Sequence, residues 1–272
     1  MTGRAARTLQ PLVWAAVPVL LLQGRRVRAT TPRLPDATTP EGTAHPPGGT
    51  HSPDGVRLPE GAHRPDDASG GPPLHLLVLG DSTAAGVGVA VHADGIAGRL
   101  GAELAARTGR AVCWRAVARS GATAREVADR LLPAARTGPR PDLVLVLAGV
   151  NDVLRMTPVR AFGRAAAAIA AGAHAAWRAP VVFGDVPPLH RFPALPWPTR
   201  PLLGLRARAL DAELARAARA APRAAHAPLP MPADPARMFG PDGFHPGPEG
   251  YRIWAAHLAP TAARLTVGAD GG

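Results

Sequence analysis

The chain has 272 residues, of which 46% are hydrophobic, and a formal net charge of +11. Apart from its histidines, its basic residues are all arginines, which excludes a Schiff-base lysine and a Gly-Lys-Ser/Thr phosphate loop. The single cysteine, Cys113, excludes an intramolecular disulfide and a zinc site built from several cysteines. The arginines are scattered and aromatic residues for base stacking are scarce, so we expect no nucleic-acid interface.

Residues 1–30 combine an apolar run from Leu12 to Leu22 with arginines on both sides. The run is shorter than the ~20 residues that a membrane-spanning helix needs. Three interpretations remain open: an uncleaved membrane-associating segment, an export signal, or a helix packed on the domain. We favour the first, and therefore a membrane-associated or cytoplasmic location over a secreted one.

Residues 31–73 are rich in proline, glycine, threonine, histidine and aspartate and contain almost no large apolar residues. Such a composition cannot bury enough surface to offset the entropy of ordering. We therefore expect a disordered linker over residues 31–73, followed by one catalytic domain over residues 74–268.

Strand-like and helix-like runs alternate along that domain, which predicts a mainly parallel sheet of five strands with helices on both faces. The strands are expected at 74–80, 111–117, 142–148, 180–184 and 225–229. The helices are expected at 93–108, 123–136, 158–178, 201–221 and 247–265.

Residues suited to catalysis follow the first three predicted strands and precede the last predicted helix. They are Asp81-Ser82, Ser120-Gly121, Asn151-Asp152 and the segment from Asp242 to His245. Each segment alone is equally typical of a turn or a helix cap. Because open α/β sheets place their functional loops at the carboxyl ends of strands, we expect the four to meet at one edge.

The chemistry of these residues fits a serine nucleophile. The Ser82 hydroxyl needs a neighbouring base, which His245 can provide, and Asp242 lies three residues earlier, where it can orient the imidazole. The backbone N–H groups of Ser82 and Gly121 and the side chain of Asn151 are candidate donors to an oxyanion.

These segments together resemble the SGNH subgroup of the GDSL-type esterases and lipases. Gly80-Asp81-Ser82 matches the first block, Gly121 the second without an asparagine before it, residues 149–152 the third, and residues 242–245 the fifth. The resemblance covers roughly residues 74–265. It implies a flavodoxin-like three-layer α/β/α sandwich, Ser82, His245 and Asp242 as the catalytic residues, and Ser82, Gly121 and Asn151 as the oxyanion hole.

The leading hypothesis is a carboxylic-ester hydrolase that forms an acyl-enzyme on Ser82 and uses no metal or cofactor. The alternatives are an acyltransferase or thioesterase on the same site, or a non-catalytic membrane-tethered binding domain. We expect a monomer that acts on a small-molecule or lipid ester and associates with membranes through residues 1–30.

The apolar segment from Val186 to Trp197 follows the fourth predicted strand. It is either a wall for an acyl chain or ordinary packing against the helix at 201–221. The first interpretation makes Phe192 and Trp197 substrate-binding residues.

Overall fold

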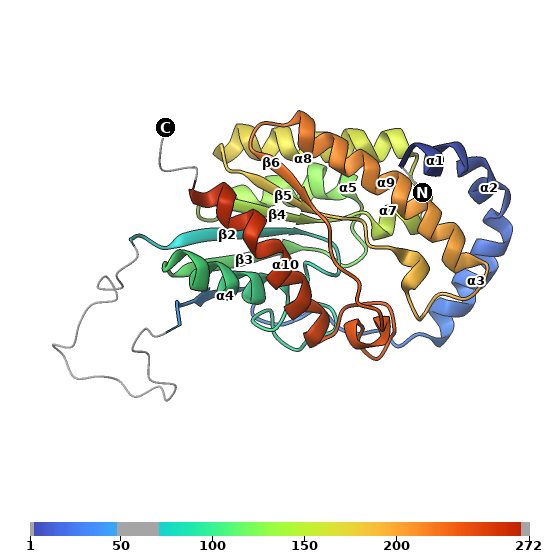
Figure 1. The fold of residues 1–272 in the computed structure, drawn as a ribbon, viewed down its shortest axis with the longest axis horizontal. Coiled ribbons are helices and arrows are strands. Elements are labelled where there is room, and N and C mark those ends of the chain that lie inside the picture. Colours follow the sequence, from blue (N-terminus) through green and yellow to red (C-terminus); the bar gives the residue numbers. More distant parts are fainter. Residues whose placement is uncertain (1–2, 48–70, 268–272) are drawn as a thin grey trace.

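The computed structural model of the chain describes residues 3–47 and 71–267, and its centre is a six-stranded sheet (Figure 1). The strand order is β1-β3-β2-β4-β5-β6, with β1 antiparallel to β3 and all other neighbours parallel. The strands are β1 (Glu41–Ala44), β2 (Leu74–Gly80), β3 (Val112–Ala118), β4 (Leu143–Leu147), β5 (Val181–Gly184) and β6 (Ala224–Ala227). The five parallel strands confirm the prediction, and their order is that of a flavodoxin-like sheet.

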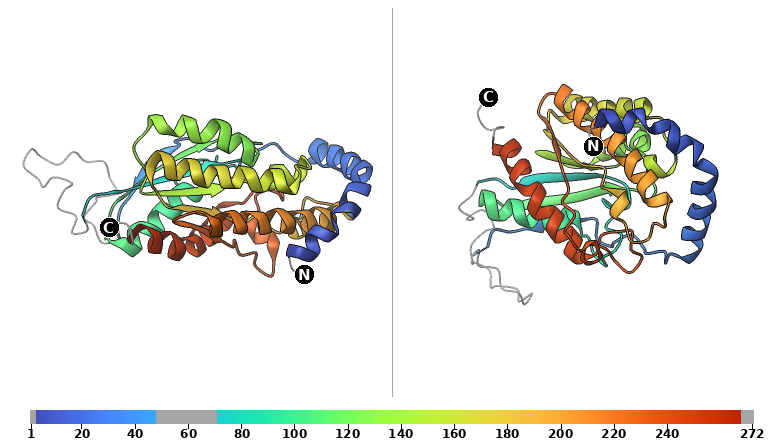
Figure 2. Two further views of the ribbon diagram at one scale, coloured as in Figure 1. Left: turned by 90° about the horizontal axis from the view of Figure 1, so that it is seen from above. Right: turned by 45° about the vertical axis from the view of Figure 1, so that its right-hand side comes forward.

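Helices cover both faces of the sheet and complete the predicted three-layer sandwich (Figures 1 and 2). One face packs against α4 (Ile96–Thr108) and α10 (Pro248–Val267), and the other against α8 (Val159–Trp177) and α9 (Thr199–Ala220).

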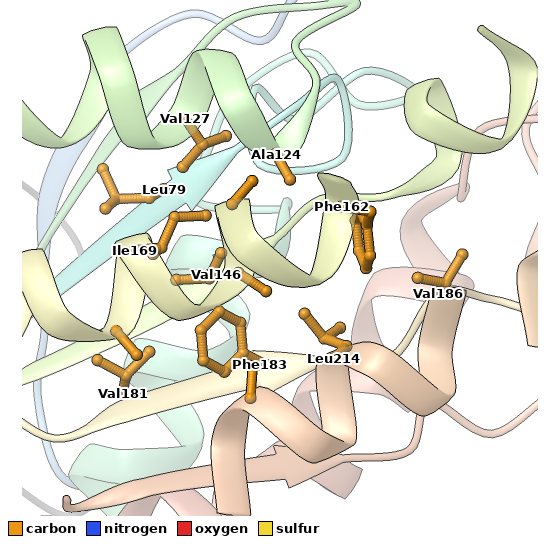
Figure 3. Close-up of a cluster of buried hydrophobic side chains, with 14 of the residues drawn as sticks. Leu79, Ala124, Val127, Val146, Phe162, Ile169, Val181, Phe183, Val186 and Leu214 are labelled. Carbon is orange, nitrogen blue, oxygen red and sulfur yellow. The ribbon is translucent and has the colours of Figure 1, made fainter. Parts of the chain in front are cut away.

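The sheet is buried on both faces because its central strands are apolar almost throughout: β4 is apolar at every position, and in β2 only His75 is polar. In β2, Leu77 and Leu79 join the core on the α8 and α9 side, whereas Leu76 and Val78 join the core on the α4 and α10 side. Figure 3 shows the first of these cores, in which Phe183 of β5 packs close to the helices. This alternation within continuous apolar strands is typical of a central parallel sheet.

The helix predicted at 123–136 is divided into shorter elements. They are α5 (Ala124–Glu126), a π-helical turn (Val127–Leu131), α6 (Leu132–Ala134) and a 3-10 turn (Ala135–Thr137). Thr123 begins α5 as a capping box with Glu126, and Pro133 has no N–H to continue regular helical bonding. The remaining short elements are α7 (Val150–Leu154) and 3-10 turns at Leu189–Arg191 and Pro235–Met238.

The expectation of a linker over residues 31–73 is wrong for residues 31–47, and residues 48–70 lie outside the described residues. Strand β1 lies within the expected linker and pairs with β3. Upstream of β1, the Ala37 N–H donates to the Ala85 carbonyl at 2.9 Å, and the Thr38 N–H donates to Ala90 at 2.9 Å. Backbone hydrogen bonds hold this segment in place. They do not depend on large apolar side chains, so the composition of residues 31–73 gives no sign of them.

The first described residues form three helices, α1 (Gly3–Thr8), α2 (Gln10–Ala15) and α3 (Val17–Thr30), which lie along the outer side of α9 (Figures 1 and 2). Arg7 forms an ion pair with the buried Glu213 of α9 at 2.5 Å, and Ala6 and Val13 are fully buried. Helices α1, α2 and α3 therefore pack on the domain, as the third interpretation of residues 1–30 expects, and they also carry exposed apolar side chains such as Leu22, so the membrane-associating interpretation stays a prediction. Within the described residues, none of the helices has the length and apolar character needed to cross a membrane.

Candidate active site

Ser82 lies in the tight turn that follows β2. At Gly80, the last residue of that strand, a side-chain Cβ would lie only 2.0 Å from the Leu147 carbonyl oxygen of β4, so glycine is required. The same carbonyl accepts a hydrogen bond from the Asp81 N–H at 3.0 Å. The turn therefore contacts the end of the neighbouring central strand β4 directly, and this contact holds the backbone of Ser82 in place.

Ser82, His245 and Asp242 form a continuous hydrogen-bonded chain. The Ser82 Oγ lies 3.0 Å from His245 Nε2, and His245 Nδ1 lies 2.5 Å from Asp242 Oδ2. The other carboxylate oxygen of Asp242 accepts the backbone N–H groups of Phe244 and His245, each at 2.9 Å. Burial raises the pKa of Asp242, but its hydrogen bonds from the His245 ring and these N–H groups leave the pKa below its ordinary value. Asp242 is thus an anion that fixes the ring of His245.

Asp81 connects the nucleophile turn to the loop that carries Asn151. One carboxylate oxygen of Asp81 accepts the Thr83 N–H at 3.0 Å, and the other lies 3.4 Å from Asn151 Nδ2. Burial raises the pKa of Asp81 to about 6, although the Thr83 hydrogen bond and the charge of His245 oppose this. Asp81 therefore shapes the turn and also positions a neighbouring side chain.

The three candidate oxyanion donors surround Ser82. Gly121 has a left-handed backbone (φ 83°), and its carbonyl accepts a hydrogen bond from Arg155 Nη2 at 2.8 Å. Within the described part of the chain, the backbone N–H groups of Ser82 and Gly121 have no hydrogen-bond partner in the protein. Asn151 Nδ2 also donates to the Ala122 carbonyl at 3.1 Å, so its amide is oriented between the two loops.

Two residues with no predicted catalytic or oxyanion role hold the loops of the site in place. Asp152 is fully buried and accepts the Ala124 N–H at 2.8 Å, which joins the loops of Asn151 and Gly121. The Tyr251 hydroxyl of α10 donates to the Val87 carbonyl at 2.7 Å and to the Thr83 carbonyl at 3.3 Å. These partners are distant in sequence and follow no spacing rule, so only the structure identifies them.

A cavity of about 580 Å³ opens over Ser82. Its polar end contains all the predicted catalytic and oxyanion residues, namely Ser82, Gly121, Asn151, Asp242 and His245. Its apolar walls come from α3 through Val17, Leu20, Leu21 and Val27, and from the rest of the domain through Val87, Val150, Leu154, Met156, Leu195, Leu203 and Phe244. A polar end with apolar walls is the usual form of a site for a partly apolar small molecule.

The assignment of Phe192 and Trp197 to substrate binding is not matched by their positions. Phe192 is buried behind the cavity, where its ring packs edge-on against Phe244 at 5.2 Å between centroids. Trp197 is 80% exposed, and neither residue lines the cavity. Leu195 lines it instead. The apolar character of this segment did not indicate which of its side chains face inward.

Among the described residues, no three histidine, cysteine, aspartate or glutamate side chains are grouped so that they could hold a metal ion.

Residues 78–253 match the family described as GDSL-like lipase/acylhydrolase. The chain is 34% identical over 194 residues to the GDSL-like esterase Rv1075c of Mycobacterium tuberculosis, a match that covers 67% of this chain and 59% of that protein. Among solved structures, TesA is similar with 25% identity and a TM-score of 0.54, covering 70% of this chain and 99% of TesA. A G-D-S-L family lipolytic protein of Veillonella parvula shares the fold, with 17% identity, a TM-score of 0.56, and coverage of 70% and 99%.

Proposed function

Because the chain belongs to the GDSL-like lipase/acylhydrolase family, whose members hydrolyse esters, we propose that it cleaves carboxylic esters through an acyl-enzyme on Ser82. The observation that carries the proposal is the hydrogen-bonded chain from Ser82 through His245 to Asp242, with contacts of 3.0 and 2.5 Å. A binding domain without turnover has no need for this arrangement, so the geometry favours catalysis over that alternative.

In the proposed first step, the Ser82 Oγ attacks the acyl carbon while His245 Nε2 takes the hydroxyl proton. The anionic Asp242 at Nδ1 keeps the ring in the tautomer that leaves Nε2 free to accept, and stabilises the imidazolium that forms. His245 then gives the proton to the leaving alcohol, and the C–O bond of the ester breaks. Water, activated by the same nitrogen, releases the acid and restores Ser82.

The negative charge of the tetrahedral intermediate falls on the former carbonyl oxygen. The backbone N–H groups of Ser82 and Gly121 are available to that oxygen, and Asn151 Nδ2 becomes a third, uncharged donor when it exchanges its long 3.4 Å contact with Asp81 for the oxyanion. Loss of one such donor typically costs ~2.7–4 kcal/mol of transition-state stabilisation.

The cavity favours an ester with an apolar acyl chain. Its walls beyond the catalytic group are mostly aliphatic, with hydroxyl groups only at Thr31, Ser120 and Thr199, and Arg33 is the only other charged lining residue among the described residues. Such walls stabilise a hydrocarbon chain by burying it and do not recognise a highly polar acyl group.

The proposal is tested by labelling with a fluorophosphonate and mapping the modified peptide, together with hydrolysis of p-nitrophenyl butyrate. We expect the label on Ser82, and we expect Ser82→Ala to lower kcat by about 10⁴-fold or more. Ser120→Ala is the matched control, because Ser120 also lines the cavity but hydrogen bonds to Asp36 and not to His245. A label that persists in Ser82→Ala, or undiminished activity of that variant, would overturn the mechanism.

A further inference from the structure

Helix α3 is apolar on two opposite sides, although only one of them faces the protein. The stripe of Val17, Leu20, Gly24 and Val27 lines the cavity. On the other side, Val19 is 42% exposed and Leu22 is 71% exposed. A surface helix normally presents polar residues on its outer side. The exposed Val19 and Leu22 therefore indicate that the outer side of α3 contacts another apolar surface.

The exposed apolar side chains of the molecule are concentrated in one region. Of the eight large apolar side chains that are exposed among the described residues, six lie within residues 9–22 and the others are Leu154 and Trp197. Leu154 lines the same cavity as Leu21 of α3, and the Trp197 carbonyl accepts a hydrogen bond from Gln23 of α3 at 3.1 Å. We call these eight side chains the apolar rim. Isolated exposed apolar residues are ordinary, but their concentration at one place marks an interaction site.

The charge around the apolar rim is positive. Residues 3–35 contain six arginines and no aspartate or glutamate, and Arg25 and Arg26 are exposed on α3. A second copy of the chain would bring the same positive charge to the interface, which opposes association through this surface. An anionic surface is the complementary partner.

We propose that the apolar rim, with Arg25 and Arg26, docks the protein onto a lipid bilayer that contains anionic headgroups. Apolar side chains of neighbouring helices enter the interfacial layer, and arginines contact the headgroups, as in helices that lie in a membrane surface without crossing it. Leu21 and Leu154 belong both to the apolar rim and to the cavity, so docking brings the cavity mouth to the bilayer. In this position the bilayer supplies the ester substrate, an inference that rests on the proposed function as well as on the docking.

The docking is tested by flotation of the full chain with vesicles of phosphatidylcholine alone and with equal parts of phosphatidylglycerol. We expect binding to the anionic vesicles and at least about tenfold weaker partitioning of Leu12→Ser/Leu22→Ser. Neither leucine lines the cavity, so hydrolysis of soluble p-nitrophenyl butyrate should be unchanged in this variant. The single variant Leu22→Ala and a melting curve of each protein separate lost docking from lost folding.

The electrostatic part has a matched control. Arg25→Gln/Arg26→Gln and Arg130→Gln/Arg136→Gln both remove two exposed arginines, but only the first pair lies on α3. We expect the first variant to bind anionic vesicles about tenfold more weakly at low salt and the second to bind like the wild type.

Three outcomes would overturn the docking proposal: no binding of the wild type to anionic vesicles at low salt, wild-type binding by Leu12→Ser/Leu22→Ser, or a dimer that this variant dissociates. Ser82→Ala should float like the wild type. An inactive wild type that still floats would refute the proposed function but not the docking.

Discussion

Among the described residues, two partly buried pairs of a carboxylate and an imidazole can be compared, and only one of them lies in the candidate active site. Asp242 and His245 are 2.5 Å apart, and the far ring nitrogen of His245 faces Ser82 in an open cavity. Asp211 of α9 and His226 of β6 are 2.8 Å apart. Within the described residues, no nucleophilic side chain hydrogen bonds to His226.

The environment of the second pair explains its different character. Burial and, to a smaller extent, the negative charge of Asp211 raise the pKa of the nearby Asp185 to about 7, although the Leu229 backbone hydrogen bond and the charge of His226 oppose this. Burial lowers the pKa of His226, but its hydrogen bond to Asp211 and the charges of Asp211 and Asp185 leave the pKa above its ordinary value. The two pairs therefore differ in what adjoins them. Asp242 and His245 adjoin a nucleophilic side chain and a cavity, whereas we expect Asp211 and His226 to affect only the stability of the fold.

The largest expected effect comes from removing the acid of the first pair. Asp242→Asn should lower kcat by about 10⁴-fold, because a neutral amide does not hold the required tautomer of His245 or stabilise its cation. The matched control is Asp211→Asn, which removes the same charge from the second pair and should leave kcat within about twofold. Steady-state kinetics of both variants test the comparison, and equal losses in the two would contradict it.

The cavity is the second difference between the pairs, and Gly24 of α3 allows it to be altered. A Cβ at Gly24 would have no neighbour within 4 Å, and Gly24 lines the cavity, so we expect a larger side chain there to extend into the cavity. Gly24→Phe should lower kcat/KM for p-nitrophenyl esters with acyl chains of eight or more carbons by about tenfold. The phenyl ring would occupy the part of the cavity that a long acyl chain fills. Hydrolysis of the acetate should change little.

Gly24→Ala controls for the gain in helix propensity, about 0.5–1 kcal/mol, that comes from replacing glycine by alanine. It should leave the preference for chain length unaltered. An unchanged preference in Gly24→Phe would show that α3 does not contact the acyl chain.

The smallest expected effect concerns stability near the second pair. The pKa of Asp185 is higher in the folded protein than in the unfolded chain. Its contribution to the free energy of unfolding is therefore most favourable below the unfolded-state pKa and is lost as the pH rises toward 7. Asp185→Asn should therefore raise Tm at pH 8 by a few degrees, corresponding to about 1–2 kcal/mol, with a gain that shrinks toward pH 4.

Asp211→Asn should act in the opposite direction. The raised pKa of His226 contributes stability that is fully present below its unfolded pKa and lost as the pH rises through the folded value. The loss of stability in Asp211→Asn, relative to the wild type, should therefore be largest at acidic pH. Thermal melts from pH 4 to 8 measure both effects, and a pH-independent change in either variant would contradict these assignments.

The parallel sheet and the grouping of the candidate catalytic residues could be predicted from the sequence because each depends on local patterns. Continuous apolar runs such as Leu143–Leu147 identify buried strands, and polar residues at strand ends identify the edge where chemistry occurs. Ser82 and His245 are 163 positions apart, yet the order of the strands brings them to the same edge.

Strand β1 and the apolar walls of the cavity could not be predicted in this way. Strand β1 is short and polar and is held by backbone pairing, and α3 becomes a cavity wall only because α1 and α2 pack on α9. The outward direction of Trp197 likewise depends on tertiary packing. These features depend on contacts between distant segments, which composition and periodicity do not encode.

The hydrogen bonds of Tyr251 have a consequence for the order of folding. They hold the nucleophile loop through partners 164 and 168 positions away, so a very long loop of chain must close before they can form. Such closure is entropically costly and slow compared with the formation of local helices. We therefore expect a refolding chain to regain most of its helical structure before its nucleophile is correctly placed, so that activity is among the last properties to return.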